Sequence, residues 1–298
     1  AKTIGATIFY INRPIELEYI KTKVSLDSIL KNKLVSSNFE IATKSIVLKD
    51  FVQFVRSVTF RPELLILETI IKDGKINLDL NLNFDQNGKI KNDYKINGKL
   101  EETKIKFLKD FNFEKINFLF HLKNKSFLLK NINFTAANVN FNSDLIRIIK
   151  FDNSYKVEGK IENSKSILTE KLANLLNLNL KNLDFENTKF SSKNNFSFEI
   201  DRRFKSKNLK VESDIIIDLI QYKNVSSYSN LFPDLKKKIF LKNQNLKLKY
   251  ENNSLSIKGK GKIKLGNRSQ DIDYSIIKNK DNLEFETDLI VKQTTLNN

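Results

Sequence analysis

The chain has 298 residues, of which 40% are hydrophobic, with only eight glycines and three prolines. This length suits one large domain or two smaller ones with a substantial core, and the low glycine and proline content excludes a disordered or low-complexity chain. The net charge is +17, cysteine is absent and there is one histidine, so disulfide bridges, thiolate nucleophiles and cysteine-based zinc sites are excluded.

The first expected strand is Thr7–Ile11, close to the beginning of the sequence at Ala1. Because the first residue is Ala rather than Met, we expect a piece of a longer protein whose signal or anchor lies upstream. No run approaches about 18 apolar residues, so no segment is expected to span a membrane. The skew towards Lys, Asn, Ile and Phe is what an AT-rich genome produces, and we expect most lysines to form a solvated sheet face.

The first expected helix covers Ser45–Phe60, where apolar residues recur at helical spacing. Pro62 follows directly, and proline in a helix interior removes a backbone hydrogen bond. We therefore expect the helix to end before this residue.

The clearest strand signal runs from Ile76 to Asp85, where apolar and polar residues alternate without a break. The dipeptides Asp73-Gly74 before it and Asn87-Gly88 after it favour tight hairpin turns. The sequence therefore predicts a meander of three antiparallel strands without crossover helices, at 65–72, 75–85 and 89–100.

The alternation continues beyond residue 100, with a slip in phase near Ala136-Ala137 that predicts a β-bulge. Helical spacing returns at Ser164–Leu176, and a third short helix is expected at Asn230–Phe240. Further strands are expected around Ile116, Phe118, Phe120 and Leu122; Ile132 and Phe134; Val139 and Phe141; Phe196, Phe198 and Ile200; Leu246, Leu248 and Tyr250; Leu255 and Ile257; Ile263 and Leu265; and Leu283 and Phe285.

A weak internal repeat links Tyr94–Leu100 with Tyr155–Ile161, and more faintly with Ser256–Lys260. Each has an apolar residue two positions before Gly and a Lys after it, although chance similarity in a biased composition is a competing explanation. Repeated strand blocks favour an extended architecture. We expect a mostly β fold, an extended, twisted antiparallel sheet that forms a groove with a few short helices. It would be one elongated domain over 1–298, with sub-blocks 1–62, 63–163 and 177–298.

No catalytic machinery is evident. His121, the single histidine, is out of phase with the apolar residues of its strand and is expected to face solvent. The glycines are too dispersed for a phosphate-binding loop, and acidic residues such as Asp271 and Asp273 are scattered. We expect a protein that is not an enzyme, with no catalytic residue, metal or cofactor.

The positive charge raises nucleic acid as a partner. Proteins that bind single strands interleave basic and aromatic residues on one exposed face. Here the phenylalanines are in phase with Ile and Leu while the lysines are out of phase, and only seven of the 52 basic residues are Arg. No nucleic-acid partner is expected.

An amphipathic sheet must cover its apolar face by folding into a sandwich, by closing into a barrel, or by leaving a groove that something else fills. The long strands favour the groove, and a closed core is the open alternative. The groove would be lined by the in-phase apolar residues Ile76, Leu78, Leu80, Leu82, Phe84, Ile96, Phe118, Phe120, Leu122, Ile132, Phe134, Phe196, Phe198 and Ile200.

Residues 45–100 resemble the AsmA-like family of bacterial envelope proteins. The resemblance rests on the helix ending in Phe60-Arg61-Pro62-Glu63-Leu64, the Asp73-Gly74 hairpin, the alternating strand Ile76–Phe84, the turn Asp85–Lys89 and the strand Tyr94–Leu100. Residues 101–161 continue in the same style, and the remainder matches in general character only. These motifs are loose, and the family has no catalytic motif to carry over.

The resemblance implies a bridge-like lipid transfer protein whose β groove carries phospholipid or a similar amphiphile between the inner and outer membranes. It also implies a periplasmic location, anchorage to the inner membrane through a segment outside this chain, and outer-membrane proteins as further candidate partners. Two other functions stay open. A structural or adhesive envelope protein with a closed core would purify without lipid, and a lysine-rich polyanion binder would lose affinity steeply with salt.

Overall fold

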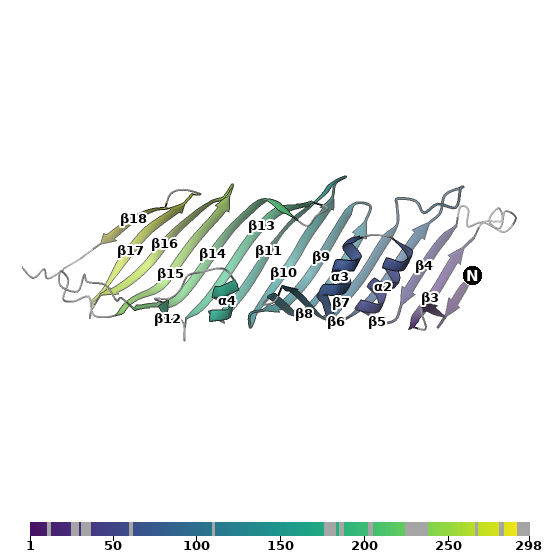
Figure 1. Cartoon of the computed structure of the whole chain (residues 1–298), viewed down its shortest axis with the longest axis horizontal. Helices are drawn as coiled ribbons and strands as arrows, with labels where there is room; N and C mark the ends of the chain where they lie inside the picture. The colour runs from purple at the N-terminus through teal and green to yellow at the C-terminus, as the bar shows by residue number, and fades with distance from the viewer. Residues whose placement is uncertain are drawn as a thin grey trace, which may run out of the picture. The chain divides into compact units, whose positions relative to one another are not determined.

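The computed structural model confirms the mostly β fold: antiparallel strands form an open sheet that does not close on itself, with three short helices in the described part of the chain (Figure 1). The structure describes residues 1–10, 13–24, 30, 37–59, 62–108, 111–175, 183–184, 188–201, 205–223, 238–265, 268–279 and 283–290. The chain divides into two compact units, unit 1 with residues 1–135 and 143–155, and unit 2 with residues 136–142 and 156–298.

Unit 1 is a meander of long strands with two helices. Its elements are β1 (Lys2–Ile4), β2 (Thr7–Tyr10), β3 (Arg13–Lys23), β4 (Asn38–Thr43), β5 (Ile46–Val47), α2 (Leu48–Val58), α3 (Pro62–Ile70), β6 (Ile71–Asn83), β7 (Lys95–Leu108), β8 (Phe111–Lys123) and β9 (Ser126–Ala136). Strands β3, β4, β6, β7 and β8 pair in that order, each antiparallel to the next. The short strands β1 and β2 both pair with β3, and β5 pairs with β6.

Unit 2 is a second meander. Strands β10 (Val139–Lys150) and β11 (Ser154–Ile167) contribute residues to both units. The other elements are α4 (Glu170–Leu175), β12 (Leu183–Asp184), β13 (Lys189–Asp201), β14 (Ser206–Lys223), β15 (Lys238–Glu251), β16 (Ser254–Leu265), β17 (Arg268–Lys278) and β18 (Leu283–Ile290). From β13 to β18 each strand pairs antiparallel with the next, and β12 pairs with β14.

The core of unit 1 lies between the sheet and helix α2. Apolar residues of this helix recur at helical spacing, so Leu48 and Val52 share one face and are buried. They form a single cluster with the sheet residues Ile15, Leu17, Ile46, Ile71, Ile76, Leu78 and Leu100. Burying this face is what keeps so short a helix folded, because isolated helices of this length are marginal in water.

Helices α2 and α3 lie next to each other on the sheet, over β6 and β7 (Figure 1). Glu68 of α3 joins them: its Oε1 accepts a hydrogen bond from Gln53 Nε2 at 2.8 Å, and its Oε2 lies 2.8 Å from Arg56 Nε. Both partners belong to α2, so these contacts hold the two helices together on the part of the apolar face that they cover. None of the helices in the described residues has the length and apolar character that a membrane crossing requires.

The helix expected at Ser45–Phe60 is confirmed as α2, with a later start because Ile46 and Val47 first pair with β6. The strand expected at 65–72 is wrong, since α3 occupies Pro62–Ile70. Pro62, expected only to end a helix, stands at the first position of the next one. There its missing N–H is tolerated and its fixed φ suits a helix.

The hairpin expected at Asp73-Gly74 is also wrong, because both residues lie inside β6. The register of β6 against β7 shifts on either side of Asp73, which marks a β-bulge. Gly74 has a φ of +134°, and a Cβ there would lie 2.3 Å from Thr103 Oγ1, so glycine serves the bulge rather than a turn.

The turn at Asn87-Gly88 is confirmed. Asp85 Oδ1 accepts hydrogen bonds from the backbone N–H groups of Asn87 at 2.8 Å and Lys89 at 2.9 Å. The following strand, expected at 89–100, begins only at Lys95. The connection before it is therefore longer than expected, and within it Phe84 and Ile90 form an isolated β-bridge.

Three later expectations need correction. Ala136-Ala137 is not a bulge but leads into a hairpin turn, because Ala137 and Asn138 both have positive φ values of 49° and 66°.

The helix expected at Ser164–Leu176 is shorter and corresponds to α4, because β11 continues to Ile167. Thr169 Oγ1 caps this helix by accepting a hydrogen bond from Leu172 N at 3.1 Å. Of the helix expected at Asn230–Phe240, residues 230–237 lie outside the described residues and Lys238–Phe240 begin β15.

Candidate functional site

The apolar residues of unit 1 stand in rungs, which are sets of residues directly opposite one another on neighbouring strands with their side chains on one face. The inner rung contains Ile46, Ile76, Leu100 and Phe118; the middle rung contains Leu78, Gly98 and Phe120; and the outer rung contains Ile20, Ile41, Leu80, Ile96 and Leu122. Neighbouring rungs are two residues apart along each strand, or roughly 7 Å. The alternating sequence pattern is therefore converted into an apolar surface that crosses five strands.

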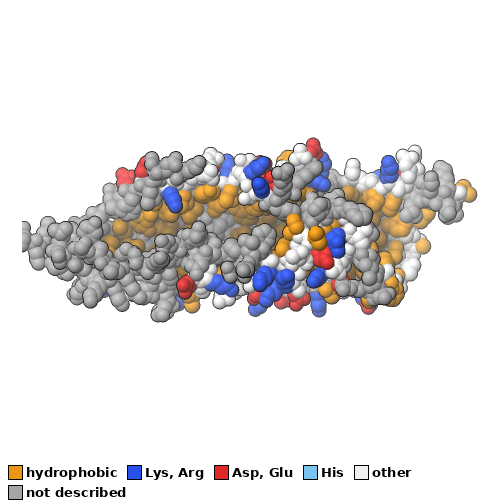
Figure 2. Space-filling view, viewed as in Figure 1, with side chains coloured by type: hydrophobic (Ala, Val, Ile, Leu, Met, Phe, Trp, Pro, Cys, Tyr) orange, Lys and Arg blue, Asp and Glu red, His pale blue; other side chains and the backbone are white. Residues whose placement is uncertain are grey.

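The two helices cover only part of this surface. Ile76 and Leu78 are each 4% exposed beneath α2 and α3, whereas Leu80, Ile96 and Leu122 of the outer rung are only half-buried. Figure 2 shows hydrophobic side chains gathered over the strands of each unit, with charged side chains along their borders. The apolar face of unit 1 is thus closed under the helices and partly open beyond them.

Glycine at position 98 shapes the middle rung. The ring of Phe120 lies across it, and a Cβ at Gly98 would be 2.3 Å from Phe120 Cζ. That ring also meets Phe118 and Phe127 at centroid distances of 6.2 and 5.5 Å. The glycine therefore lets an aromatic side chain lie flat along the sheet instead of standing away from it.

Unit 2 presents the same arrangement. Successive rungs contain Val211, Tyr250 and Leu255; Ser213, Leu248, Ile257 and Ile276; and Ile215, Leu246, Gly259 and Tyr274. The apolar members are all half-buried. At Gly259 the ring of Tyr274 takes the place that Phe120 takes in unit 1, since a Cβ there would be 2.2 Å from Tyr274 Cζ.

A polar group interrupts the apolar rungs of unit 2. Gln244 is fully buried, and its Nε2 donates hydrogen bonds to the carbonyl oxygens of Lys242 at 2.9 Å and Lys262 at 3.2 Å. Its Oε1 accepts a hydrogen bond from the Tyr274 hydroxyl at 3.2 Å, and burial raises the pKa of that hydroxyl. Gly261 leaves room for the amide, because a Cβ there would be 2.1 Å from Nε2. The group is satisfied within the protein and ties β15, β16 and β17 together.

A cleft of about 710 Å³ crosses β14 to β18 in unit 2. Its lining includes the rung of Ile215, Leu246, Gly259 and Tyr274. It also includes residues from the alternate positions, whose side chains leave the opposite face of the sheet, among them three lysines and three acids: Asp214, Lys247, Lys258, Lys260, Asp273 and Glu286. Cavities of this size hold small-molecule ligands in other proteins.

The fourteen residues expected to line a groove fall on both units. Ile76, Leu78 and Ile132 are buried, and the other eleven are half-buried. Seven of the residues in unit 1 belong to the rungs described above: Ile76, Leu78, Leu80, Ile96, Phe118, Phe120 and Leu122. Leu82 and Phe84 follow the outer rung at the end of β6, and Ile132 and Phe134 belong to β9. Phe196, Phe198 and Ile200 belong to β13 of unit 2, where the first two rings stack at 6.0 Å.

Other residues of these faces were missed. Ile215, Ile257 and Ile276 were not among the expected lining residues, and neither was the pair of Gln244 and Tyr274. One signal was present in the sequence: Gly259 and Gly261 stand where the alternation calls for apolar side chains. A glycine inside a strand often marks a place that a neighbouring group fills.

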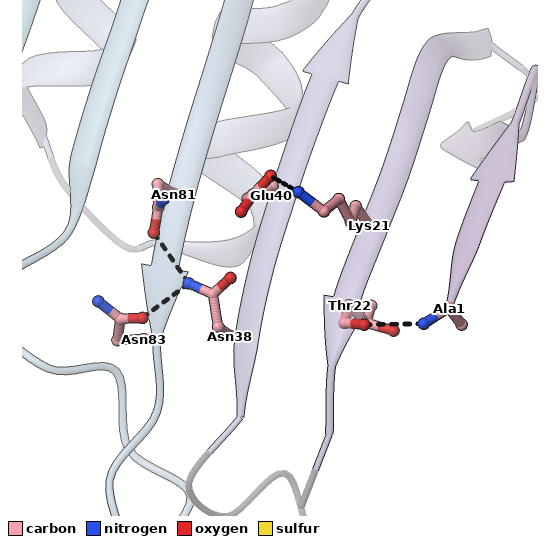
Figure 3. A network of polar contacts seen from close by, with 7 residues as sticks. All are labelled: Ala1, Lys21, Thr22, Asn38, Glu40, Asn81 and Asn83. Atoms are coloured by element: carbon pink, nitrogen blue, oxygen red, sulfur yellow. Dashed lines mark hydrogen bonds and ion pairs between the residues drawn. The ribbon is translucent and has the colours of Figure 1, made fainter.

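The opposite face of the sheet is polar. His121 lies on it as expected, and its Nδ1 meets Oδ1 of Asn97, its neighbour on β7. Figure 3 shows part of this face, where Lys21 Nζ donates to Glu40 Oε2 at 2.9 Å and Asn38 Nδ2 donates to Asn81 and Asn83. Exposed contacts of this kind add little stability, and among the described residues no three His, Asp or Glu side chains converge as a metal site.

Comparison with known proteins adds no relative. No model of a known protein family matches the chain, and no curated protein or solved structure matches it either. The resemblance of residues 45–100 to the AsmA-like family stays a prediction.

Proposed function

We propose that this protein binds phospholipid, or a similar amphiphile, along its apolar sheet face and carries it without chemical change. The observation that carries the proposal is the outer rung of unit 1. Leu80, Ile96 and Leu122 stand in register on an open sheet, and they are only partly buried beyond the edge of the helices. Extended apolar surfaces that remain accessible on a soluble fold usually mark sites of interaction.

The repetition of rungs suits carriage better than fixed binding. Burying one CH₂ group is worth about 0.8 kcal/mol, so an acyl chain lying across several rungs gains substantial affinity. Because successive strands each contribute an apolar side chain to the outer rung, an acyl chain that shifts from one strand to the next loses little free energy. In this proposal the cargo moves between the inner and outer membranes of the envelope, as the resemblance of residues 45–100 implies, and the anchor lies outside this chain.

A structural or adhesive role with a closed core is the second candidate. It is favoured by the inner rung, where Ile76, Leu78 and Leu100 are buried against α2 like any protein core. If the outer rung were covered in the same way, no surface would be left for a lipid, and the protein would purify without one.

A pair of substitutions on one strand tests the proposal. Leu122 faces the apolar side of β8, whereas Leu119 lies on its polar side and is 43% exposed. Leu122→Asp should abolish co-purifying lipid, measured by extraction and mass spectrometry, while circular dichroism shows an intact sheet. Leu119→Asp adds the same charge to the same strand and should keep its lipid. Equal lipid in both variants, or unfolding caused by Leu122→Asp alone, would support the closed core instead.

A further inference from the structure

Helix α3 is turned the opposite way from an ordinary surface helix, which buries its apolar side and exposes its polar side. Leu64 packs against the core cluster of unit 1, and Glu68, four residues later on the same face, lies against α2. The Glu68 side chain is only 17% exposed. Leu65, Ile66 and Leu67 point to the other sides of the helix, and their exposed fractions are 55%, 41% and 38%.

Helix α2 shows what the outer side of a helix on this sheet ordinarily carries. It buries Leu48 and Val52 and presents Lys49 and Arg56 to solvent. The two helices lie next to each other on the same face of the sheet (Figure 1). The difference between them therefore comes from their sequences, because the run Leu64–Leu67 is apolar on every side of the helix.

The outer side of α3 offers little that a folded protein partner could recognise by hydrogen bonding. Thr69 is the polar residue beside the three aliphatic side chains, and its hydroxyl donates within the helix, to the Leu65 carbonyl oxygen at 2.9 Å. Specific protein interfaces form about one hydrogen bond per 100–200 Å². A surface without a free donor among its described side chains fits hydrocarbon better than such an interface.

Two cations stand beside this apolar surface. The side chain of Arg56 on α2 is 45% exposed, and its Nε lies 2.8 Å from Oε2 of Glu68 on α3. Lys72 is exposed, and its Nζ donates to the Thr69 carbonyl oxygen at 2.7 Å, at the C-terminal end of α3. Basic side chains beside an apolar helix surface can reach lipid phosphates when the helix rests in a bilayer surface. The net charge of +17 draws the whole chain to anionic membranes.

The apolar surface of α3 lies on the same side of the sheet as the outer rung. Leu64 of the helix and Leu80 and Ile96 of the outer rung all pack against one core cluster, so helix and rung share one face of the sheet. A bilayer resting on α3 would therefore lie on the side where this rung is only partly buried. A lipid leaving that bilayer would reach the rung without passing to the polar face.

We propose that α3 is a membrane-docking helix, whose Leu65, Ile66 and Leu67 enter the surface of a lipid bilayer while Arg56 and Lys72 lie at its phosphates. The contact is shallow and reversible, because one short helix supplies it. This inference rests on the proposed carriage of lipid for its purpose. It adds the place at which the protein meets the membrane that supplies or receives the lipid.

Flotation of the whole chain with vesicles measures the docking. The vesicles consist of phosphatidylcholine with a minor share of phosphatidylglycerol. The variant Leu65→Gln/Ile66→Gln should bind them roughly thirtyfold more weakly, because two aliphatic side chains each lose about half of a full burial. Glutamine is a good helix former, so α3 should stay folded.

A matched control is available on the polar face of the sheet. Leu119→Gln/Ile216→Gln changes the same two residue types at exposed fractions of 43% and 51%, and it should bind vesicles like the wild type. Both double variants keep the net charge of the chain. The attraction to phosphatidylglycerol is therefore equal in the two, and the difference between them reports insertion of α3.

A fluorescent reporter identifies the surface that enters the bilayer. The chain contains no tryptophan, so Leu67→Trp places a single indole on α3. Its emission should shift to shorter wavelength when vesicles are added and should be quenched by lipids with brominated acyl chains. Leu119→Trp places the indole on the polar face and should show neither change.

The outcomes separate docking from carriage. A wild type that does not float, equal binding by the two double variants, or an unchanged Leu67→Trp spectrum would each refute docking by α3, and co-purified lipid would then leave carriage standing. Docking through α3 by a protein that never yields extractable lipid would refute carriage alone. A dimer that forms without vesicles and is dissociated by Leu65→Gln/Ile66→Gln would also refute docking, because a second copy would then cover α3.

Discussion

The difference between the inner and outer parts of the apolar face can be tested with two alanine substitutions. Leu78 is 4% exposed and packs in the cluster beneath α2, so Leu78→Ala leaves a cavity. Such substitutions in a core cost about 2–5 kcal/mol, and about 3 kcal/mol is expected here. Leu122 is half-buried in the outer rung. Removing its three outer carbons at about 0.8 kcal/mol each, with most of that contact present and no closed cavity left behind, gives about 2 kcal/mol.

Urea denaturation followed by circular dichroism measures these losses of unfolding free energy, and lipid extraction measures bound lipid per folded molecule. Leu78→Ala should lower stability more and leave bound lipid unchanged, whereas Leu122→Ala should lower stability less and reduce bound lipid. Equal losses of stability would refute the reasoning, because they would show that the outer rung is covered as fully as the inner one.

Three further predictions concern glycine packing and titration. Gly98→Ala pushes a Cβ against the Phe120 ring and should cost about 1–3 kcal/mol in a urea melt; wild-type stability would contradict the close contact. Tyr274→Phe removes the hydrogen bond to Gln244 and should cost about 1 kcal/mol. Burial raises the pKa of Tyr274, so the wild type, unlike this variant, should lose stability as pH rises beyond about 10, which pH-dependent melts would detect. Backbone hydrogen bonds lower the pKa of Asp85, so its carboxylate should stabilise the turn above the ordinary Asp pKa. As pH falls through the lowered pKa, the amides of Asn87 and Lys89 should lose protection from hydrogen exchange relative to their intrinsic exchange rates.

Strong local periodicity is what made the strands predictable. The alternation from Ile76 onwards specifies which side chains share a face, and β6 has this arrangement from Ile76 to Asn83. The helix at Pro62–Ile70 was missed because Leu64–Leu67 is a short continuous apolar run, which is compatible with either a strand or a helix. What decides its form is its position over β6 and β7 and the contacts of Glu68 with α2, and neither is visible in the local sequence.

The candidate sites depend even more on register. Gln244 and Tyr274 meet across β16, where the register of β15 against β16 shifts between Lys242 and Asn245. A bulge of this kind leaves no clear mark in a sequence rich in Lys and Asn.

The central claim is that the apolar face is an open surface for lipid. Native mass spectrometry of the purified chain, with extraction and identification of whatever it carries, tests that claim most directly. The account predicts a folded protein with a heterogeneous population of bound phospholipid. A single lipid-free mass from a well-folded sample would contradict it and would indicate that the face is closed on itself.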